Sequence, residues 1–201
     1  MLKYNQTILK RYLKWGWVAF IVISIVFGVL TLSLARNYPH AIHQIMQSLK
    51  NIMPSSTTST QMFWGILGNN ERAALIIMLL SLVPLPGFYW LTFGVTSISV
   101  GFVLGVSAIT GGMKSAVLAF IVGILPHGIF EMSALLLAVA LSAQLNRAWR
   151  QFLFQRRPAT NSLQVRKVLG QYILLVVPLI AVAAVIESFI TPQLIHWGTG
   201  F

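Results

Sequence analysis

Residues 16–35 read GWVAFIVISIVFGVLTLSLA, an apolar run of 20 residues without a charged side chain. A helix of this length crosses a hydrocarbon core of about 30 Å. Four lysines and arginines precede the run, as they do in a signal peptide. The run is longer than a usual signal core, however, and no clear small-residue cleavage site follows it. We therefore interpret residues 16–35 as an uncleaved membrane span.

The composition of the whole chain indicates a membrane protein. Of 201 residues, 57% are hydrophobic and 8% are charged, with 14 lysines and arginines against three glutamates. A soluble domain is usually about one quarter charged, so this chain has too few charges to cover a water-facing surface. The absence of cysteine excludes a disulfide scaffold and most metal clusters. We expect residues 1–201 to form a single all-α membrane domain without a separate soluble catalytic domain.

Four further apolar runs predict a bundle of about five transmembrane helices. The predicted spans are residues 16–35, 73–93, 95–110, 115–141 and 168–190. The second span is interrupted at residues 84–87, and we expect a tight turn near Gly94. Pro126 to Gly128 interrupt the fourth span, where proline kinks or breaks a helix. Thr191 and Pro192 are expected to end the fifth span.

The distribution of basic residues predicts the topology. Four bases precede the first span and six lie in residues 142–167, out of fourteen in the chain. The positive-inside rule then places the N-terminus in the cytoplasm and the C-terminus outside the cell membrane. Residues 142–167 form an amphipathic basic segment that is expected to lie on the anionic inner leaflet rather than on nucleic acid. Residues 38–70 form the outer connection, which includes a second amphipathic helix.

Small residues mark a packing face on the third predicted span. Ser97, Gly101 and Gly105 repeat every four residues. Such a stripe lets the backbone of another helix approach closely in lipid. It therefore predicts helix packing within the chain, with a homo-oligomer through the same stripe as the alternative.

The fourth predicted span carries two ionisable residues. His127 and Glu131 are four residues apart and share one face of a continuous helix. A carboxylate inside a membrane is costly and normally faces the bundle interior or a wet cavity. The pair is either a hydrogen-bonded contact that holds the helix in register, or a proton relay or substrate contact. Both interpretations stay open at the level of sequence.

A shared metal site is not expected from the predicted spans. On straight helices Glu131 lies about 24 Å below the outer end of its span, whereas Glu187 lies about 5 Å below the outer end of its own. Metal ligands must lie within about 2.2 Å of the ion, so only a re-entrant break at Pro126 could unite these residues. We assign no metal and no cofactor, and no known catalytic motif is present. Glu187 is expected instead to pair with Arg72 near Glu71 at the outer interface, or to form part of a docking surface there.

Four sequence blocks together resemble the stage II sporulation protein M family. They are residues 63–70 (FWGILGNN), 100–105 (VGFVLG), 125–134 (LPHGIFEMSA) and 186–192 (IESFITP). The residues that match the family's motifs are Asn69, Asn70, Gly101, Gly105, His127, Gly128, Glu131, Glu187, Thr191 and Pro192. Thr96 and Ser97 depart from the Asn-Gly that the family often has before its glycine stripe. The resemblance covers about residues 60–192 and implies a polytopic membrane protein.

The resemblance also implies a function. The family's named member anchors a complex with peptidoglycan hydrolases during engulfment. The leading hypothesis is therefore a non-enzymatic scaffold that recruits envelope-remodelling or peptidoglycan-remodelling proteins. The alternative is a small transporter or lipid-handling permease that uses His127 and Glu131, and a membrane hydrolase ranks third.

Overall fold

The computed structural model describes residues 2–38, 40, 44, 47, 58–155 and 162–199. These residues are helical almost throughout, and none of them forms a β-strand, which confirms the all-α prediction. Most of the amphipathic helix predicted between residues 38 and 70 lies outside the described residues. The same is true of residues 156–161 at the centre of the basic segment.

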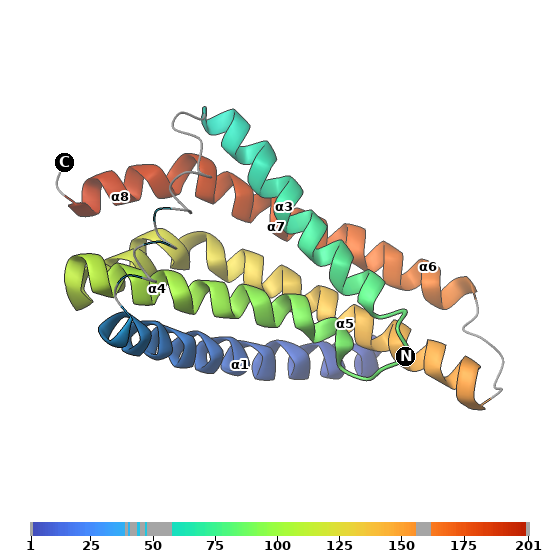
Figure 1. The fold of residues 1–201 in the computed structure, drawn as a ribbon. Coiled ribbons are helices and arrows are strands. Elements are labelled where there is room, and N and C mark those ends of the chain that lie inside the picture. The colour runs from blue at the N-terminus through green and yellow to red at the C-terminus, as the bar shows by residue number, and fades with distance from the viewer. Residues whose placement is uncertain are drawn as a thin grey trace.

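The described helices alternate in direction along the bundle (Figure 1). The elements in chain order are α1 (Leu2–Asn37), α3 (Ser59–Leu80), a 3₁₀ turn η1 (Phe88–Trp90), α4 (Leu91–Leu118), a π-helical segment η2 (Ala119–Ile124), α5 (Leu125–Gln155), α6 (Ser162–Gln171), a π-helical segment η3 (Tyr172–Val176), α7 (Val177–Val185), a π-helical segment η4 (Ile186–Ile190) and α8 (Thr191–Thr199). Helices α1, α4 and the α6–α8 series run one way, and α3 and α5 run the other. The N-terminus therefore lies at the opposite end of the bundle from the C-terminus.

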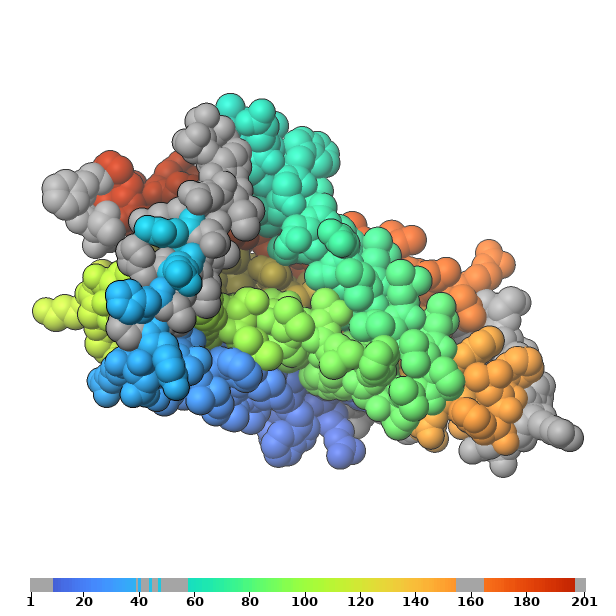
Figure 2. Space-filling model, in the orientation of Figure 1, coloured from blue at the N-terminus to red at the C-terminus, as the bar shows by residue number. Residues whose placement is uncertain are grey.

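Helix α5 forms the centre of the bundle. Met132 and residues 134–142 are all buried, and all of them except Ala140 and Ser142 pack into one apolar cluster with Ile77 of α3, Phe93 of α4 and Ile180 of α7. The other helices expose many large apolar side chains on their outer faces, as a lipid-facing surface requires. In Figure 2 the visible face is hollowed between α3 and α4, and α5 is seen at the bottom of the hollow.

Within the described residues, three helical segments are long and apolar enough to cross a membrane. They are Leu9–Asn37, Phe88–Phe154 and Val165–Trp197. The second segment is interrupted at Gly112, whose backbone has φ 76° and ψ 177°. Glycine adopts this left-handed region without the steric cost that a side chain would add. The chain reverses there, so that α4 and α5 lie antiparallel, and Gly112 falls between the predicted spans 95–110 and 115–141. The count of five spans stays a prediction.

The bounds of the predicted second span, residues 73–93, were wrong, although the interruption expected at residues 84–87 is present as a turn between two helices. Its helix begins much earlier, at Ser59, because Thr58 and Gln61 form a capping box at the N-terminus. It ends at Leu80, and the following turn contains Pro84, Pro86 and a left-handed Gly87 with φ 84°. Two prolines so close together cannot continue a helix, and the turn therefore lies here. The turn expected near Gly94 is also wrong, because that residue lies inside α4.

Three prolines are accommodated by π-helical turns rather than by breaks. Pro126, Pro178 and Pro192 follow η2, η3 and η4 within two residues. The backbone N–H just after each π segment bonds the carbonyl five residues earlier, for example from Thr191 to Ile186. A proline lacks an N–H and its ring crowds the preceding turn, and a wider turn relieves both problems. The predicted break at Pro126 to Gly128 is not confirmed, since α5 continues through those residues.

Candidate functional site

Three ionisable side chains meet in the interior of the bundle. His127, Glu131 and Glu187 each present a ligand atom, and these atoms all lie within 4.8 Å of one another. The His127 Nε2 lies 3.8 Å from the Glu187 Oε2, in an ion pair if the imidazole is protonated. The side chains of His127 and Glu187 are only 11% and 28% exposed. We call these three residues the polar cluster.

The polar cluster is assembled from two chain segments. The first turns of α5 supply His127 and Glu131, which share a helix face at a spacing of four residues. The η4 segment supplies Glu187. The depth argument that separated Glu131 from Glu187 was therefore wrong. Pro192 does not end the last helix, which runs another twelve residues beyond Glu187, about 18 Å, and so places Glu187 deep in the bundle.

An asparagine from a third helix supports the polar cluster. Asn70 of α3 is buried, and it lies near enough to Glu131 for its amide to act on that carboxylate as a hydrogen-bond donor. The Asn69 Nδ2 donates to the Asn70 Oδ1 at 3.5 Å, which leaves the Asn70 amide nitrogen for Glu131. Phe63 of α3 packs on Phe189 of η4, with ring centroids 6.4 Å apart, and holds α3 beside the cluster. The paired asparagines therefore orient one of the carboxylates.

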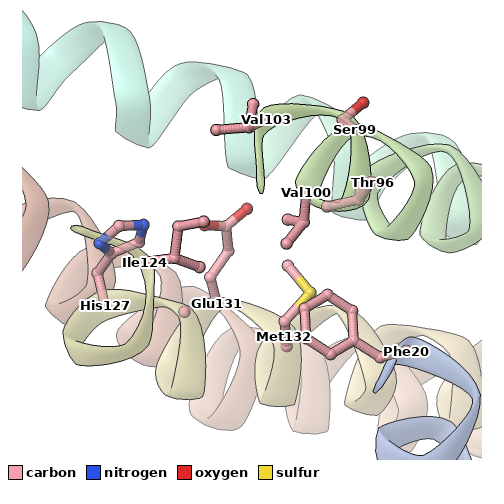
Figure 3. Close-up of a pocket in the computed structure, with 10 residues that line it drawn as sticks. Phe20, Thr96, Ser99, Val100, Val103, Ile124, His127, Glu131 and Met132 are labelled. Atoms are coloured by element: carbon pink, nitrogen blue, oxygen red, sulfur yellow. The ribbon is translucent and has the colours of Figure 1, made fainter. Parts of the chain in front are cut away.

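A cavity of about 180 Å³ adjoins the polar cluster. Figure 3 shows the Glu131 side chain between His127 and Met132, pointing toward α4. Most of the cavity wall is apolar, and its polar groups come from α4 and from the cluster. The residues that line it are Phe20, Thr96, Ser99, Val100, Val103, Ile124, His127, Gly128, Glu131 and Met132. At roughly 30 Å³ for each water in the liquid, this volume exceeds that of a single water molecule.

The electrostatic balance of the polar cluster needs positive charge. Two unit charges 4.8 Å apart repel each other by about 3.5 kcal/mol at an effective dielectric constant of 20. Among the described residues that line the cavity, no lysine or arginine is present to offset this repulsion. The His127 Nδ1 is buried without a hydrogen-bond partner, and so are the hydroxyl oxygens of Ser188 and Thr191. A bound proton would remove this repulsion, and a divalent cation would neutralise both carboxylates.

Arg72, the predicted partner of Glu187 at the outer interface, is not paired with it. No ion pair joins Glu187 to Arg72 in the described part of the chain, and Arg72 is exposed. The neighbouring Glu71 accepts a 2.8 Å hydrogen bond from the Tyr172 hydroxyl. Sequence reasoning missed Tyr172 in this role, because a lone tyrosine in an apolar helix gives no signal of its partner. The Thr191 side chain is buried just after the polar cluster, and Pro192 lies on the exposed side of the chain.

The small-residue stripe lies against α1. Ser97, Gly101 and Gly105 are all buried. The Ser24 hydroxyl of α1 donates to the Ser97 carbonyl at 3.0 Å. A Cβ atom on Gly101 would lie 2.4 Å from the Ser24 carbonyl oxygen, and one on Gly105 would lie 2.6 Å from the Cβ of Thr31. The stripe therefore serves packing within the chain, which covers the face that a homodimer would need.

Comparison with known proteins places the chain in a family. A family model described as stage II sporulation protein M matches residues 17–192. The chain belongs to the stage II sporulation protein M family. No curated protein and no solved structure matches it. Membership in the stage II sporulation protein M family and the three long apolar helices together identify a membrane protein.

The structure brings together motif residues that are far apart in the sequence. The first, third and fourth blocks of the stage II sporulation protein M resemblance contribute Asn70, His127, Glu131 and Glu187 to one site. Gly128 lies on the cavity wall beside them. The second block contributes the α1 packing face and Val100 and Val103 of the cavity wall. The blocks thus build one site and the helix contact next to it.

Proposed function

We propose that this member of the stage II sporulation protein M family is a small membrane transporter or permease whose polar cluster binds a cationic group. The observation that carries the proposal is the convergence of His127, Glu131 and Glu187 beside a cavity. Ionisable residues inside a membrane are rare, and they mark ion pathways and proton relays. Two carboxylates in a low-dielectric interior favour a positively charged occupant.

The shape of the site supports a small occupant. The cavity of about 180 Å³ is lined by His127, Glu131 and other residues of α5, and its remaining walls come from α1, α4 and η2. The apolar part of the wall, which includes Phe20 and Val103, suits a short hydrocarbon portion. A metal ion, a proton with water, or a protonated amine of a lipid headgroup all satisfy these conditions.

Electrical recordings from reconstituted protein test the proposal. Proteoliposomes on a solid-supported membrane are exposed to concentration jumps of H⁺, Na⁺, K⁺, Mg²⁺, Mn²⁺, Zn²⁺ and ethanolamine. We expect a transient current with at least one of these cations for the unmodified protein. Glu131→Gln and Glu187→Gln should reduce that current at least tenfold, because each removes one negative charge from the site. Glu71→Gln is the matched control, since it makes the same chemical change outside the polar cluster, and it should keep the current.

The outcome that contradicts the proposal is equally direct. Absence of a current with every cation, from protein that is helical and monodisperse, would argue against transport. Equal loss of current in Glu71→Gln and Glu131→Gln would show a general defect instead of a cation site. If Glu131→Gln and His127→Ala each complement a deletion strain at wild-type level, the polar cluster is not required for the protein's function in cells.

We also propose the five-span topology with a cytoplasmic N-terminus and an outer C-terminus. The alternating directions of α1, α3, α4, α5 and the α6–α8 series support it, with α3 in place of residues 73–93 (Figure 1). The chain lacks cysteine, so a single introduced cysteine reports its own accessibility. An impermeant thiol reagent should label Trp197→Cys from outside intact cells and Phe154→Cys only after lysis. The reverse labelling would invert the topology.

The end of α5 supports contact with the inner leaflet. Trp149, Phe152 and Phe154 are exposed there, next to the exposed Arg147 and Arg150. Aromatic and basic side chains together favour an anionic lipid surface. We propose that residues 142–167 bind this surface and not nucleic acid. Arg147→Gln with Arg150→Gln should weaken binding of phosphatidylserine in native mass spectra without changing binding of phosphatidylcholine.

A second candidate function is a non-enzymatic scaffold in cell-envelope remodelling. Family membership favours this scaffold role, because the matching family model is described as stage II sporulation protein M. The exposed Trp64, in the second turn of α3 and within residues 38–70, supports a contact surface there. Deletion of residues 38–60 should abolish recovery of envelope or peptidoglycan-remodelling partners in a pull-down, whereas Glu131→Gln should not. Undiminished recovery of every partner from the deletion would count against the scaffold.

A further inference from the structure

We infer that the polar cluster is a binding site for one divalent transition-metal ion, with His127, Glu131 and Glu187 as its protein ligands. This inference rests on the proposed function for the location of the site and names the class of cation that it takes. Transport of that ion is a separate property, and the experiment below separates the two.

The donor atoms suit such an ion. One imidazole nitrogen and two carboxylate oxygens form a ligand set that zinc, manganese and cobalt accept, whereas magnesium and calcium prefer oxygen alone. With bonds of 2.0–2.2 Å, the ligand atoms of a tetrahedral site lie about 3.4 Å apart. The His127 Nε2 and Glu187 Oε2 are already 3.8 Å apart, and the largest separation in the set is within 4.8 Å. Side-chain rotations of about 1 Å bring the three atoms to one ion.

The charge of the site matches a divalent cation. Glu131 and Glu187 together carry two negative charges when ionised, and His127 is neutral when it binds a metal. A divalent ion therefore makes the set electrically neutral, which a single proton does not. Neutrality matters here because an uncompensated charge in a low-dielectric interior is costly.

The surroundings hold the ligands in place. The Asn70 amide lies beside the Glu131 carboxylate as a potential donor, and the Asn69 amide donates to the Asn70 oxygen at 3.5 Å. Such hydrogen bonds to a ligand orient it toward the ion, and their loss typically weakens metal binding about 10-fold to 100-fold. Three protein ligands leave a position open, and the adjoining cavity has room for water as a fourth ligand.

Cobalt binding to the purified full chain tests the inference. The protein is prepared in detergent with an affinity tag that contains no histidine, treated with chelator and titrated with Co²⁺. We expect saturable visible absorption bands at one ion per chain, displaced by Zn²⁺. Glu131→Gln and Glu187→Gln should each weaken binding at least tenfold, and Asn70→Ala should weaken it about 10-fold to 100-fold. Glu71→Gln should leave the affinity unchanged within about twofold.

A cysteine substitution gives a second, positive readout. The chain contains no cysteine, so His127→Cys introduces its only thiol. Thiolate ligation to Co²⁺ produces an intense near-ultraviolet charge-transfer band that the unmodified protein cannot show. The band should appear in His127→Cys and be lost when Glu187→Gln is added. If this variant does not fold, the stoichiometry of the unmodified protein and the two glutamine variants still decide.

Several outcomes would overturn the inference. They are no saturable binding by folded unmodified protein, equal binding by Glu187→Gln, or cobalt-loaded His127→Cys without the charge-transfer band. A proton current without metal binding would leave the transport proposal standing and assign the polar cluster to protons. Stoichiometric metal binding without any current would support the metal site and refute transport.

Discussion

The close contact between α1 and α4 allows one prediction to be worked out in detail. In Gly101→Ala the new Cβ atom would lie 2.4 Å from the Ser24 carbonyl oxygen and 3.1 Å from the Gly28 nitrogen. Ordinary van der Waals contact begins near 3.4 Å, so the α1 backbone would have to retreat by about 1 Å. The Phe27 Cβ would also lie 3.0 Å away, and because all three neighbouring atoms are fixed by the α1 backbone, no side-chain rotation relieves the clash. We expect the cost of overpacking to reach about 3 kcal/mol, the upper end of the usual range.

Gly94→Ala in the same helix is the matched control. A Cβ atom on Gly94 has nothing within 4 Å. Both substitutions gain about 0.5–1 kcal/mol from replacing a helical glycine, so this gain cancels in the comparison. The difference of about 3 kcal/mol then isolates the steric cost. At roughly 2–4 °C for each kcal/mol, Gly101→Ala should unfold about 6–12 °C below Gly94→Ala.

Thermal unfolding in detergent micelles, followed by tryptophan fluorescence, measures this difference. Size-exclusion chromatography before heating confirms that both variants are monodisperse. The reasoning would be refuted if Gly101→Ala unfolded at the same temperature as Gly94→Ala or above it. That result would mean that α1 does not approach α4 closely at Gly101. The positions of Phe20 and Val100 in the cavity wall would then also be incorrect.

Three further predictions concern side chains that form hydrogen bonds between helices or to a turn. The Asn146 amide donates to the carbonyls of Ser81 at 2.9 Å and Val83 at 2.6 Å. Asn146→Ala removes these bonds, so it should destabilise the protein by about 1–3 kcal/mol. It should also make the turn at residues 81–85 more sensitive to limited proteolysis. Unchanged proteolysis would contradict this role. Tyr172→Phe leaves both Glu71 carboxylate oxygens without a hydrogen-bond partner among the described residues, so it should lower the free energy of unfolding by about 1–3 kcal/mol. Adding Glu71→Leu should recover part of this lost stability in the thermal unfolding assay. Ser24→Ala removes one interhelical hydrogen bond and should cost only about 0.6 kcal/mol, so a larger cost would point to a wider role.

The fold class and the participants in the site could be predicted from the sequence. Composition and the run at residues 16–35 are sufficient for an apolar helical protein, because a hydrophobic helix needs only length and the absence of charge. The motif blocks named Asn70, His127, Glu131 and Glu187, and the structure places all four together. A spacing of four residues was enough to place His127 and Glu131 on one helix face, while the 3.8 Å contact of His127 is with Glu187.

The meeting of Glu131 with Glu187 could not be predicted, and the reason is physical. The prediction took Pro192 as a helix end, which put Glu187 near the surface. The structure instead widens the preceding turn and continues the helix, a response that depends on packing around η4 and not on the proline alone. The extent of α3 was missed for a similar reason. The charged pair Glu71 and Arg72 looked like a boundary, whereas a capping box at Thr58 starts the helix a full 12 residues before Glu71.

Because of the π-helical turns, the geometry of the polar cluster depends on the exact number of residues in the segments around it. Each π turn holds about one residue more than an α turn, so everything beyond it is rotated by about 100° relative to a regular helix. Deleting one residue from η2 or η4 would restore regular winding and swing His127 and Glu131, or the segment after Glu187, around the helix axis by that amount. Substitutions in these segments change one side chain, but a one-residue deletion would change which face of a whole helix looks inward. The number of residues in η2 and η4 therefore constrains the polar cluster more tightly than the identity of any of their residues except Glu187.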